Sequence, residues 1–193
     1  VQKGNPPWNL RLVNPWNSLP QEFFDTVPLE KYATGKEFDK RAMQALKDMI
    51  QAGKPYGVWA VSLYRDYELQ VKLFNREVQK HLDKGIDRAK AEELAATVVA
   101  RPGTSEHHTG MAADILGSGY YSLVQSFGTS EAGKWLRENC ANYGFILRYP
   151  KEKEHITGVI YEPWHFRYVG KEHAQEIMSR GITLEEYLEE KGW

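Results

Sequence analysis

The sequence predicts an α+β fold, in which helices pack around a small, mostly antiparallel sheet. Segments with the apolar spacing of helices cluster near both ends of the chain, and a few short aromatic and β-branched segments lie between them. These short segments do not alternate regularly with helices, which argues against a parallel sheet. With 193 residues, 41% hydrophobic and 26% charged, the chain has the profile of one folded domain.

The first 28 residues have no sustained hydrophobic period. They are rich in Pro, Asn and Trp, which is typical of irregular chain. We therefore expect residues 1–28 to form an extension packed on the domain, anchored by Trp8 and Trp16, and residues 29–193 to form the domain itself.

The first half of the domain shows three helical patterns and one strand. Apolar residues at helical spacing predict a helix over residues 36–52, which Gly53 ends. Residues 57–65 are short, aromatic and β-branched, which favours a strand. Asp66 can cap a second helix that runs to about residue 82, and a third helix is predicted over residues 88–99.

The second half begins after a Pro-Gly turn. A glycine-rich loop covers residues 117–128, a helix follows over residues 130–143 and a strand over residues 145–149. Two more strands are expected to flank residues 154–158. Of two short helices at the end, the second opens at Thr183 with a Glu three residues on, a capping-box pattern.

Composition excludes several classes of function. The 25 basic and 26 acidic residues nearly cancel and form no long block, so we expect no nucleic-acid partner. Cys140 is the only cysteine, which excludes an internal disulfide and favours a buried apolar role. No apolar run is long enough to span a membrane, and no signal peptide is present. Because the sequence begins at Val1, an upstream signal or membrane anchor remains compatible with it.

Two short segments combine residues that can carry chemistry. Residues 105–114 read Ser-Glu-His-His-Thr-Gly-Met-Ala-Ala-Asp, and residues 162–165 read Glu-Pro-Trp-His. Catalytic zinc takes three protein ligands, commonly His nitrogens and a carboxylate oxygen, and leaves a position for water. His107, Asp114 and His165 satisfy that count, so the sequence predicts one zinc ion at the sheet.

The local geometry decides whether these residues can converge. Gly110 lets the chain turn after His107 and run extended to Asp114. If the chain is extended at His107, the adjacent His108 faces away, so one of the two is the ligand. Glu162 and His165 are three apart and normally point to opposite faces of a strand, so an irregularity at Pro163 is needed to bring them together.

A carboxylate and a cation complete the predicted chemistry. Glu162 can accept the proton of an attacking water activated by the metal, and Arg65 is the candidate partner of the oxyanion that forms. Simpler interpretations remain open for each: Glu162 as a solvated carboxylate, Arg65 as the partner of Asp66, and Trp164 as a core residue. Only their joint occurrence favours the catalytic interpretation.

These motifs resemble those of the VanY-like D-Ala-D-Ala carboxypeptidases, in the wider lysostaphin, D-Ala-D-Ala peptidase and hedgehog fold group. The resemblance lies in Ser-x-His-x-x-Gly-x-Ala-x-Asp at residues 105–114 and Glu-x-x-His at residues 162–165. Further matches are Ser-x-Tyr-Arg at residues 62–65, Gly-Phe-Ile-Leu-Arg-Tyr-Pro at residues 144–150 and the continuation to Gly170. The sequence departs from the family at Leu63, often Gly, and at Asp66, often Ser or Thr.

The resemblance implies a role for each residue and a zinc peptidase domain at residues 29–193. It implies that His107, not His108, is a zinc ligand with Asp114 and His165, and that Glu162 is the general base. It further implies that Arg65 and Ser105 hold the substrate's terminal carboxylate or the oxyanion. The remaining implied pocket residues are Gln70, Tyr64 and Trp164.

Three functional hypotheses follow from the resemblance. The leading one is a D,D-carboxypeptidase that removes the terminal D-Ala of peptidoglycan stem peptides, outside the cytoplasmic membrane of a bacterium and as a monomer. The runner-up is an L,D-carboxypeptidase acting on tetrapeptide stems, or a D,D-dipeptidase. A non-catalytic wall-binding module that keeps the fold is the third, and the intact motif residues argue against it.

Overall fold

A computed structural model describes Gln2 and residues 4–193, and it confirms the α+β fold class. The main sheet is antiparallel, with strand order β3-β4-β6-β5. Its strands are β3 (Trp59–Ser62), β4 (Ala112–Leu116), β5 (Phe145–Tyr149) and β6 (Glu162–Tyr168). A separate hairpin pairs β1 (Leu29–Ala33) with β2 (Lys36–Asp39).

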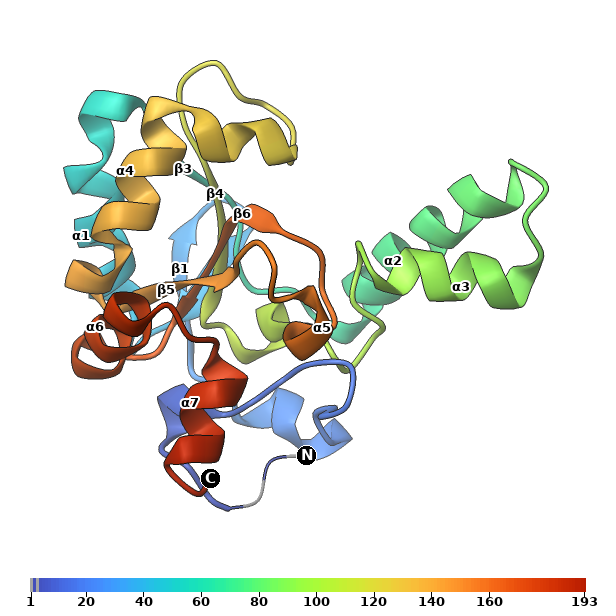
Figure 1. The fold of residues 1–193 in the computed structure, drawn as a ribbon, viewed down its shortest axis with the longest axis horizontal. Coiled ribbons are helices and arrows are strands. Elements are labelled where there is room, and N and C mark those ends of the chain that lie inside the picture. Colours follow the sequence, from blue (N-terminus) through green and yellow to red (C-terminus); the bar gives the residue numbers. More distant parts are fainter. Residues whose placement is uncertain (1, 3) are drawn as a thin grey trace.

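Helices cover the sheet and close the core (Figure 1). The helices of the body are α1 (Met43–Ala52), α4 (Glu131–Asn139), α5 (Glu154–Thr157), α6 (Lys171–Arg180) and α7 (Leu184–Glu190). Short 3-10 helices join these elements: η1 (Trp8–Leu10), η2 (Gln21–Thr26), η3 (Lys54–Tyr56), η4 (Glu106–Thr109), η5 (Gln125–Thr129) and η6 (Cys140–Tyr143). Contacts of α4 with β6 and of α6 with β5 hold the helices on the sheet. None of the helices described is long and apolar enough to cross a membrane.

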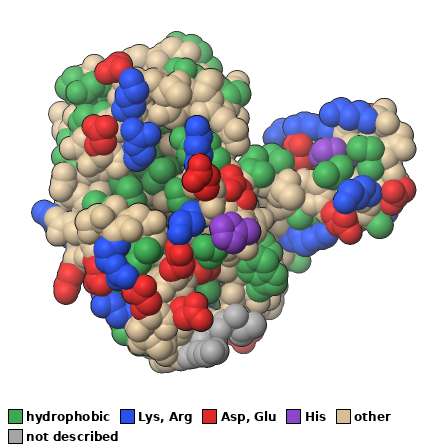
Figure 2. All heavy atoms as spheres, viewed as in Figure 1, with side chains coloured by type: hydrophobic (Ala, Val, Ile, Leu, Met, Phe, Trp, Pro, Cys, Tyr) green, Lys and Arg blue, Asp and Glu red, His purple; other side chains and the backbone are tan. Residues whose placement is uncertain are grey.

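Two helices form an arm that projects from the body (Figures 1 and 2). They are α2 (Tyr67–Leu82) and α3 (Arg88–Ala96), which pack against each other around a small apolar core of their own. As predicted, Asp66 caps α2: its Oδ1 accepts a hydrogen bond from the Leu69 amide at 2.7 Å. The arm thus has its own packing and extends to one side of the body (Figure 1).

The predicted helix over residues 36–52 is wrong in its first part. Residues Lys36–Asp39 form β2, and the helix begins only at Met43. Gly35 has φ +68°, a left-handed conformation that favours glycine and reverses the chain between β1 and β2. Phe38 lies on β2 and is fully buried in the main core, so the apolar residue that seemed to begin a helical stripe belongs to a strand.

One of the two strands expected around residues 154–158 is also wrong. In the described part of the chain β6 follows this segment, but no strand lies between Tyr149 and the segment itself, which is the short helix α5. Pro150 cannot donate to a strand ladder, and Glu152 has a left-handed φ of 66°. The chain therefore turns where a strand was expected.

The N-terminal segment packs mainly through aliphatic residues. Leu10 and Leu12 are buried in a second core with residues of α6 and α7. Trp8 lies under the guanidinium of Arg41 and is 39% exposed, whereas Trp16 is 57% exposed. Trp8 thus contributes a surface contact and Trp16 little packing, while the boundary at residue 28 stays a prediction.

Candidate metal centre

His107 and Asp114 are held on either side of a tight turn. The Ser105 hydroxyl accepts a hydrogen bond from the His107 amide at 3.3 Å and so caps η4. Gly110 ends this turn with φ +72°, and the chain enters β4. Ala113 and Ile115 belong to the main core, so the intervening Asp114 points to the opposite face of the sheet.

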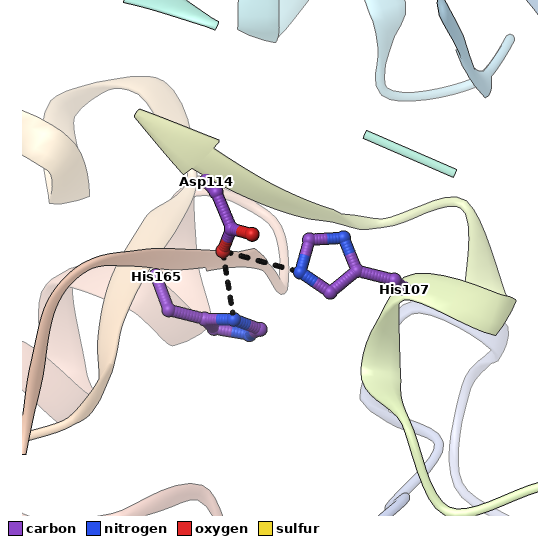
Figure 3. A group of neighbouring side chains, drawn as sticks. All are labelled: His107, Asp114 and His165. Atoms are coloured by element: carbon purple, nitrogen blue, oxygen red, sulfur yellow. Dashed lines mark hydrogen bonds and ion pairs between the residues drawn. The ribbon is translucent and has the colours of Figure 1, made fainter. Parts of the chain in front are cut away.

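His165 reaches Asp114 through the strand register. The two residues are direct cross-strand partners on β6 and β4, which places their side chains next to each other. Asp114 Oδ1 lies 3.2 Å from His107 Nε2 and 3.3 Å from His165 Nδ1. Figure 3 shows the two rings converging on this one oxygen. The three side chains are buried and offer donor atoms that all lie within 4.8 Å of one another.

These donors fit a zinc ion. Zinc bonds of 2.0–2.1 Å in a tetrahedron place neighbouring donors roughly 3.3 Å apart, close to the two distances just given. The outer nitrogens are also occupied as in known metal sites: His107 Nδ1 donates to the Leu63 carbonyl at 2.6 Å, and His165 Nε2 donates to Glu106 Oε2 at 3.1 Å. Each ring therefore turns its other nitrogen toward Asp114.

Burial and neighbouring charges shift the pKa values of all three residues in the metal-free chain. Burial and the Arg65 charge lower the pKa of His107 to about 4. Burial opposes protonation of His165, but hydrogen bonds with Asp114 and Glu106 outweigh it and raise its pKa to about 9. Burial would raise the pKa of Asp114, yet His107 and Arg65 hold it well below its usual range. Asp114 is therefore an anion, as a metal ligand must be.

Glu162 joins the site through an irregularity in β6. Between the pairs Leu147–Phe166 and Tyr149–Glu162, β5 advances by two residues and β6 by four. This bulge supplies the irregularity expected at Pro163. Glu162 Oε2 lies 3.6 Å from His165 Nδ1, and burial raises the pKa of Glu162 to about 8. A carboxyl group with a pKa near neutrality is well matched to proton transfer.

Arg65 borders the same centre and does not pair with Asp66. Its Nη2 bonds Asp114 Oδ2 at 2.6 Å, its Nη1 bonds Gln70 Oε1 at 3.2 Å, and its Nε bonds Ser62 Oγ at 3.0 Å. A guanidinium has more N–H donors than these three bonds use. The Arg65 side chain is 14% exposed, so its remaining donors are available to a ligand.

The centre opens into a cleft of about 720 Å³ between the sheet and the arm. The notch between body and arm is visible in Figure 2. Residues of the centre line one side of this cleft. The arm and the segment that returns from it contribute Leu73, Arg76 and Val99, and two loops of the body contribute Ser122, Leu123 and Ile160. The donors therefore face a space large enough for a peptide.

The four residues predicted to bind substrate divide into two pairs. Ser105 and Trp164 line the cleft, and Trp164 also belongs to the main core. Gln70 and Tyr64 are not among the lining residues. Gln70 is buried behind Arg65 and donates through Nε2 to the Ala100 carbonyl at 2.8 Å, so it orients Arg65 rather than facing the cleft.

His108 faces away from the donors. Its Nδ1 donates to the Arg65 carbonyl at 2.8 Å, and its Nε2 accepts from the Gly103 amide at 3.2 Å. Both ring nitrogens are used to hold the loop before η4. The structure thus brings His107, and not His108, to the centre.

Sequence reasoning missed the residues behind His165. Glu106 is fully buried and contacts His165, Arg148 and Arg167. The one available signal was its position inside the motif, between Ser105 and His107. Nothing in the spacing indicated its partners, because Arg148 and Arg167 are 42 and 61 residues away.

Comparisons with known proteins agree with this geometry. The family model for D-alanyl-D-alanine carboxypeptidase, VanY, matches residues 35–171. A D-alanyl-D-alanine carboxypeptidase of Enterococcus faecalis is 42% identical over 183 residues, which cover 94% of this chain and 66% of that protein. The chain thus spans about two thirds of the length of this relative.

Two solved structures extend the comparison. One is a zinc complex of a mutant of the vancomycin-resistance D,D-pentapeptidase VanY from a VanB-type cassette. It has a TM-score of 0.84 and 41% identity, over 94% of this chain and 99% of that chain. The other, the LD-carboxypeptidase LdcB, has a TM-score of 0.71 and 45% identity, over 83% of this chain and 72% of that chain.

Proposed function

The chain belongs to the VanY family of D-alanyl-D-alanine carboxypeptidases, and from that premise we propose that it is a zinc-dependent D,D-carboxypeptidase. Its substrate is the D-Ala-D-Ala end of peptidoglycan stem peptides, from which it removes the last D-Ala. The observation that carries the proposal is the convergence of two imidazoles and one carboxylate, with Glu162 and Arg65 beside them, at the base of a cleft.

The donor set supports three proposed metal ligands. His107 Nε2, Asp114 Oδ1 and His165 Nδ1 would hold one zinc ion. When bound, zinc supplies a Lewis acid that polarises the scissile carbonyl and lowers the pKa of water. The surrounding residues supply orientation and proton transfer.

Glu162 moves the proton. Its carboxylate takes a proton from the attacking water as the new C–O bond forms, and gives it to the leaving amine as the C–N bond breaks. The products are the shortened peptide and free D-Ala, with no co-reactant but water. The raised pKa of Glu162 makes its carboxylate a stronger base, which favours uptake of the proton in the first step.

Arg65 and Ser105 position the substrate. The free N–H groups of Arg65 bind the terminal carboxylate of the peptide, while its bonds to Asp114 and Gln70 keep the guanidinium in place. The Ser105 hydroxyl accepts a bond from a backbone amide and can donate its proton into the cleft. A requirement for a free terminal carboxylate distinguishes a carboxypeptidase from an endopeptidase.

We expect Arg65→Ala to lower kcat/KM by about 10²- to 10³-fold, the usual loss when one strong anion-binding donor is removed. Replacing the terminal carboxylate of the substrate by an amide should cost the parent enzyme a similar factor, and should cost the variant little. The measurement is kcat/KM for both peptides with both enzymes. Equal sensitivity of the two enzymes to the amide would show that Arg65 does not bind the carboxylate.

The specific alternative is L,D-carboxypeptidase activity on tetrapeptide stems, which the 45% identity to LdcB favours. Both reactions use the same centre, so the test is the substrate. Zinc-loaded protein is incubated with a pentapeptide stem and with a tetrapeptide stem, and the products are weighed by mass spectrometry. Loss of one alanine from the pentapeptide alone supports the proposal, whereas loss from the tetrapeptide alone supports the alternative. A free dipeptide as the preferred substrate would indicate a D,D-dipeptidase.

The proposed substrate also sets the proposed location. Stem peptides with D-Ala ends lie in the bacterial cell envelope, so we propose that the domain acts outside the cytoplasm, as a monomer and without a nucleic-acid partner. The near balance of 25 basic and 26 acidic residues supports the last point.

A further inference from the structure

Glu106 is a buried carboxylate that contacts the proposed metal ligand His165 directly, but it is neither a proposed ligand nor the proposed proton carrier. The Glu106 side chain has no exposed surface and lies behind His165, on the side away from Asp114 and Glu162. Its two oxygens have separate partners. Oε1 accepts from Arg148 Nε at 2.7 Å and from Arg167 Nη1 at 2.9 Å, while Oε2 accepts from His165 Nε2 at 3.1 Å.

The two arginines fix this carboxylate from behind. Both guanidiniums are fully buried, and they use different elements: Arg148 lies on β5 and Arg167 on β6. Arg148 also forms two bonds with Glu185 of α7, at 2.6 and 2.8 Å. Arg167 Nη2 donates to the carbonyls of Asn9 and Arg11 in the N-terminal segment. The carboxylate is therefore held by arginines of β5 and β6, and these arginines are held in turn by α7 and by the N-terminal segment.

The charges of this network balance without a contribution from His165. Arg148 and Arg167 provide two positive charges, and Glu106 and Glu185 provide two negative ones. When His165 binds a metal its ring must be neutral, and it then fits the network as a donor through Nε2, because Glu106 Oε2 can only accept. The tautomer with its proton on Nε2 leaves the Nδ1 lone pair toward Asp114 Oδ1, 3.3 Å away.

We propose that Glu106 is the positioning residue of the metal centre. Its Oε2 accepts a hydrogen bond from the Nε2–H of His165, and this bond fixes the ring and the tautomer that present Nδ1 to the zinc ion. This inference rests on the proposed zinc site. The two histidines then bind by opposite nitrogens, since His107 donates through Nδ1 to the Leu63 carbonyl and presents Nε2. The Glu106 side chain has no exposed surface and contacts His165 directly, so it acts on the metal through that ring.

Glu106→Gln is the variant that separates positioning from packing. Glutamine has nearly the same shape, but one end of its amide is a donor. If the amide oxygen faces the arginines, the NH2 group meets His165 Nε2–H and favours the opposite tautomer; if it faces His165, the NH2 group meets two guanidiniums. In either case we expect zinc affinity to fall by about 10- to 100-fold, as for other outer partners of ligating histidines.

Glu185→Gln is the matched control. It neutralises another carboxylate on the same Arg148, but Glu185 does not contact His165. We expect both variants to lower the Tm of the metal-free protein, and only Glu106→Gln to lower zinc affinity, measured by competition with a chelating dye. Equal zinc affinities for parent and Glu106→Gln, or equal losses in both variants, would overturn the positioning role.

A second measurement needs no variant. Nitrogen-15 shifts of the histidine rings in the zinc-loaded parent protein report which nitrogen carries the proton and which binds the metal. We expect His165 to be protonated on Nε2 and His107 on Nδ1. Zinc-dependent shifts in both rings with His165 protonated on Nδ1 would overturn the inference and leave the proposed function intact. No zinc-dependent shift in either ring would overturn both.

Discussion

Glu162→Ala should keep its zinc and lose nearly all turnover. Proton transfer by a positioned carboxylate contributes about 10²- to 10⁴-fold to a hydrolysis, so kcat should fall by a factor in that range. The three proposed ligand atoms lie on other residues, so metal content should remain one zinc per chain. The side chain is buried and burial raises the pKa of its carboxyl group, so its removal should not lower the Tm.

The matched control for this prediction is Glu131→Ala. Glu131 is a carboxylate on α4 with a side chain that is 80% exposed, and its removal should leave kcat and zinc content unchanged. Metal analysis and initial rates on a stem pentapeptide are measured on the same preparations. If the kcat of Glu162→Ala lies within threefold of the parent value, Glu162 is not the general base.

His165→Ala should lose the metal itself. Zinc binding worth about 10–16 kcal/mol over four ligands implies about 2.5–4 kcal/mol for each ligand, or about a 10²- to 10³-fold loss of affinity when one is removed. The loss should be larger than for Glu106→Gln, because a bond is removed rather than misdirected. Zinc per chain after dialysis should fall close to zero, and activity should fall with it.

His155→Ala provides the comparison for His165→Ala. His155 lies near the same segment of sequence but is exposed on α5, outside the donor cluster. It should retain zinc and activity at the parent level. Full zinc content in His165→Ala, with the fold intact by circular dichroism, would show that another side chain completes the ligand set.

Local signals predicted most of the elements. The capping box at Thr183 is formed by both of its hydrogen bonds, and Gly144 ends the helical segment before β5 in a left-handed conformation. Each of these features depends on residues a few positions apart. Helical spacing failed over residues 36–39, because it registers neither the hairpin pairing with β1 nor the burial of Phe38 against distant parts of the main core.

The candidate site divides in the same way. His107 and Asp114 come from one motif, whose residue types and turn at Gly110 allowed them to converge, while the choice of His107 over His108 came from the family resemblance. The approach of Glu162 to His165 depends on a bulge opposite β5, which Pro163 indicated but could not specify. Glu106 could not be assigned from sequence, since its role depends on side chains from β5 and β6 that meet only in the fold.

Titration of metal-free protein with zinc, followed by release of D-Ala from a stem pentapeptide, tests the central claim most directly. Metal-free protein should release no D-Ala. Activity should then rise in proportion to added zinc and reach its plateau at one zinc per chain, since the described residues contain one cluster of three donors that could hold a metal. Full release of D-Ala by metal-free protein in the presence of a chelator would contradict the account.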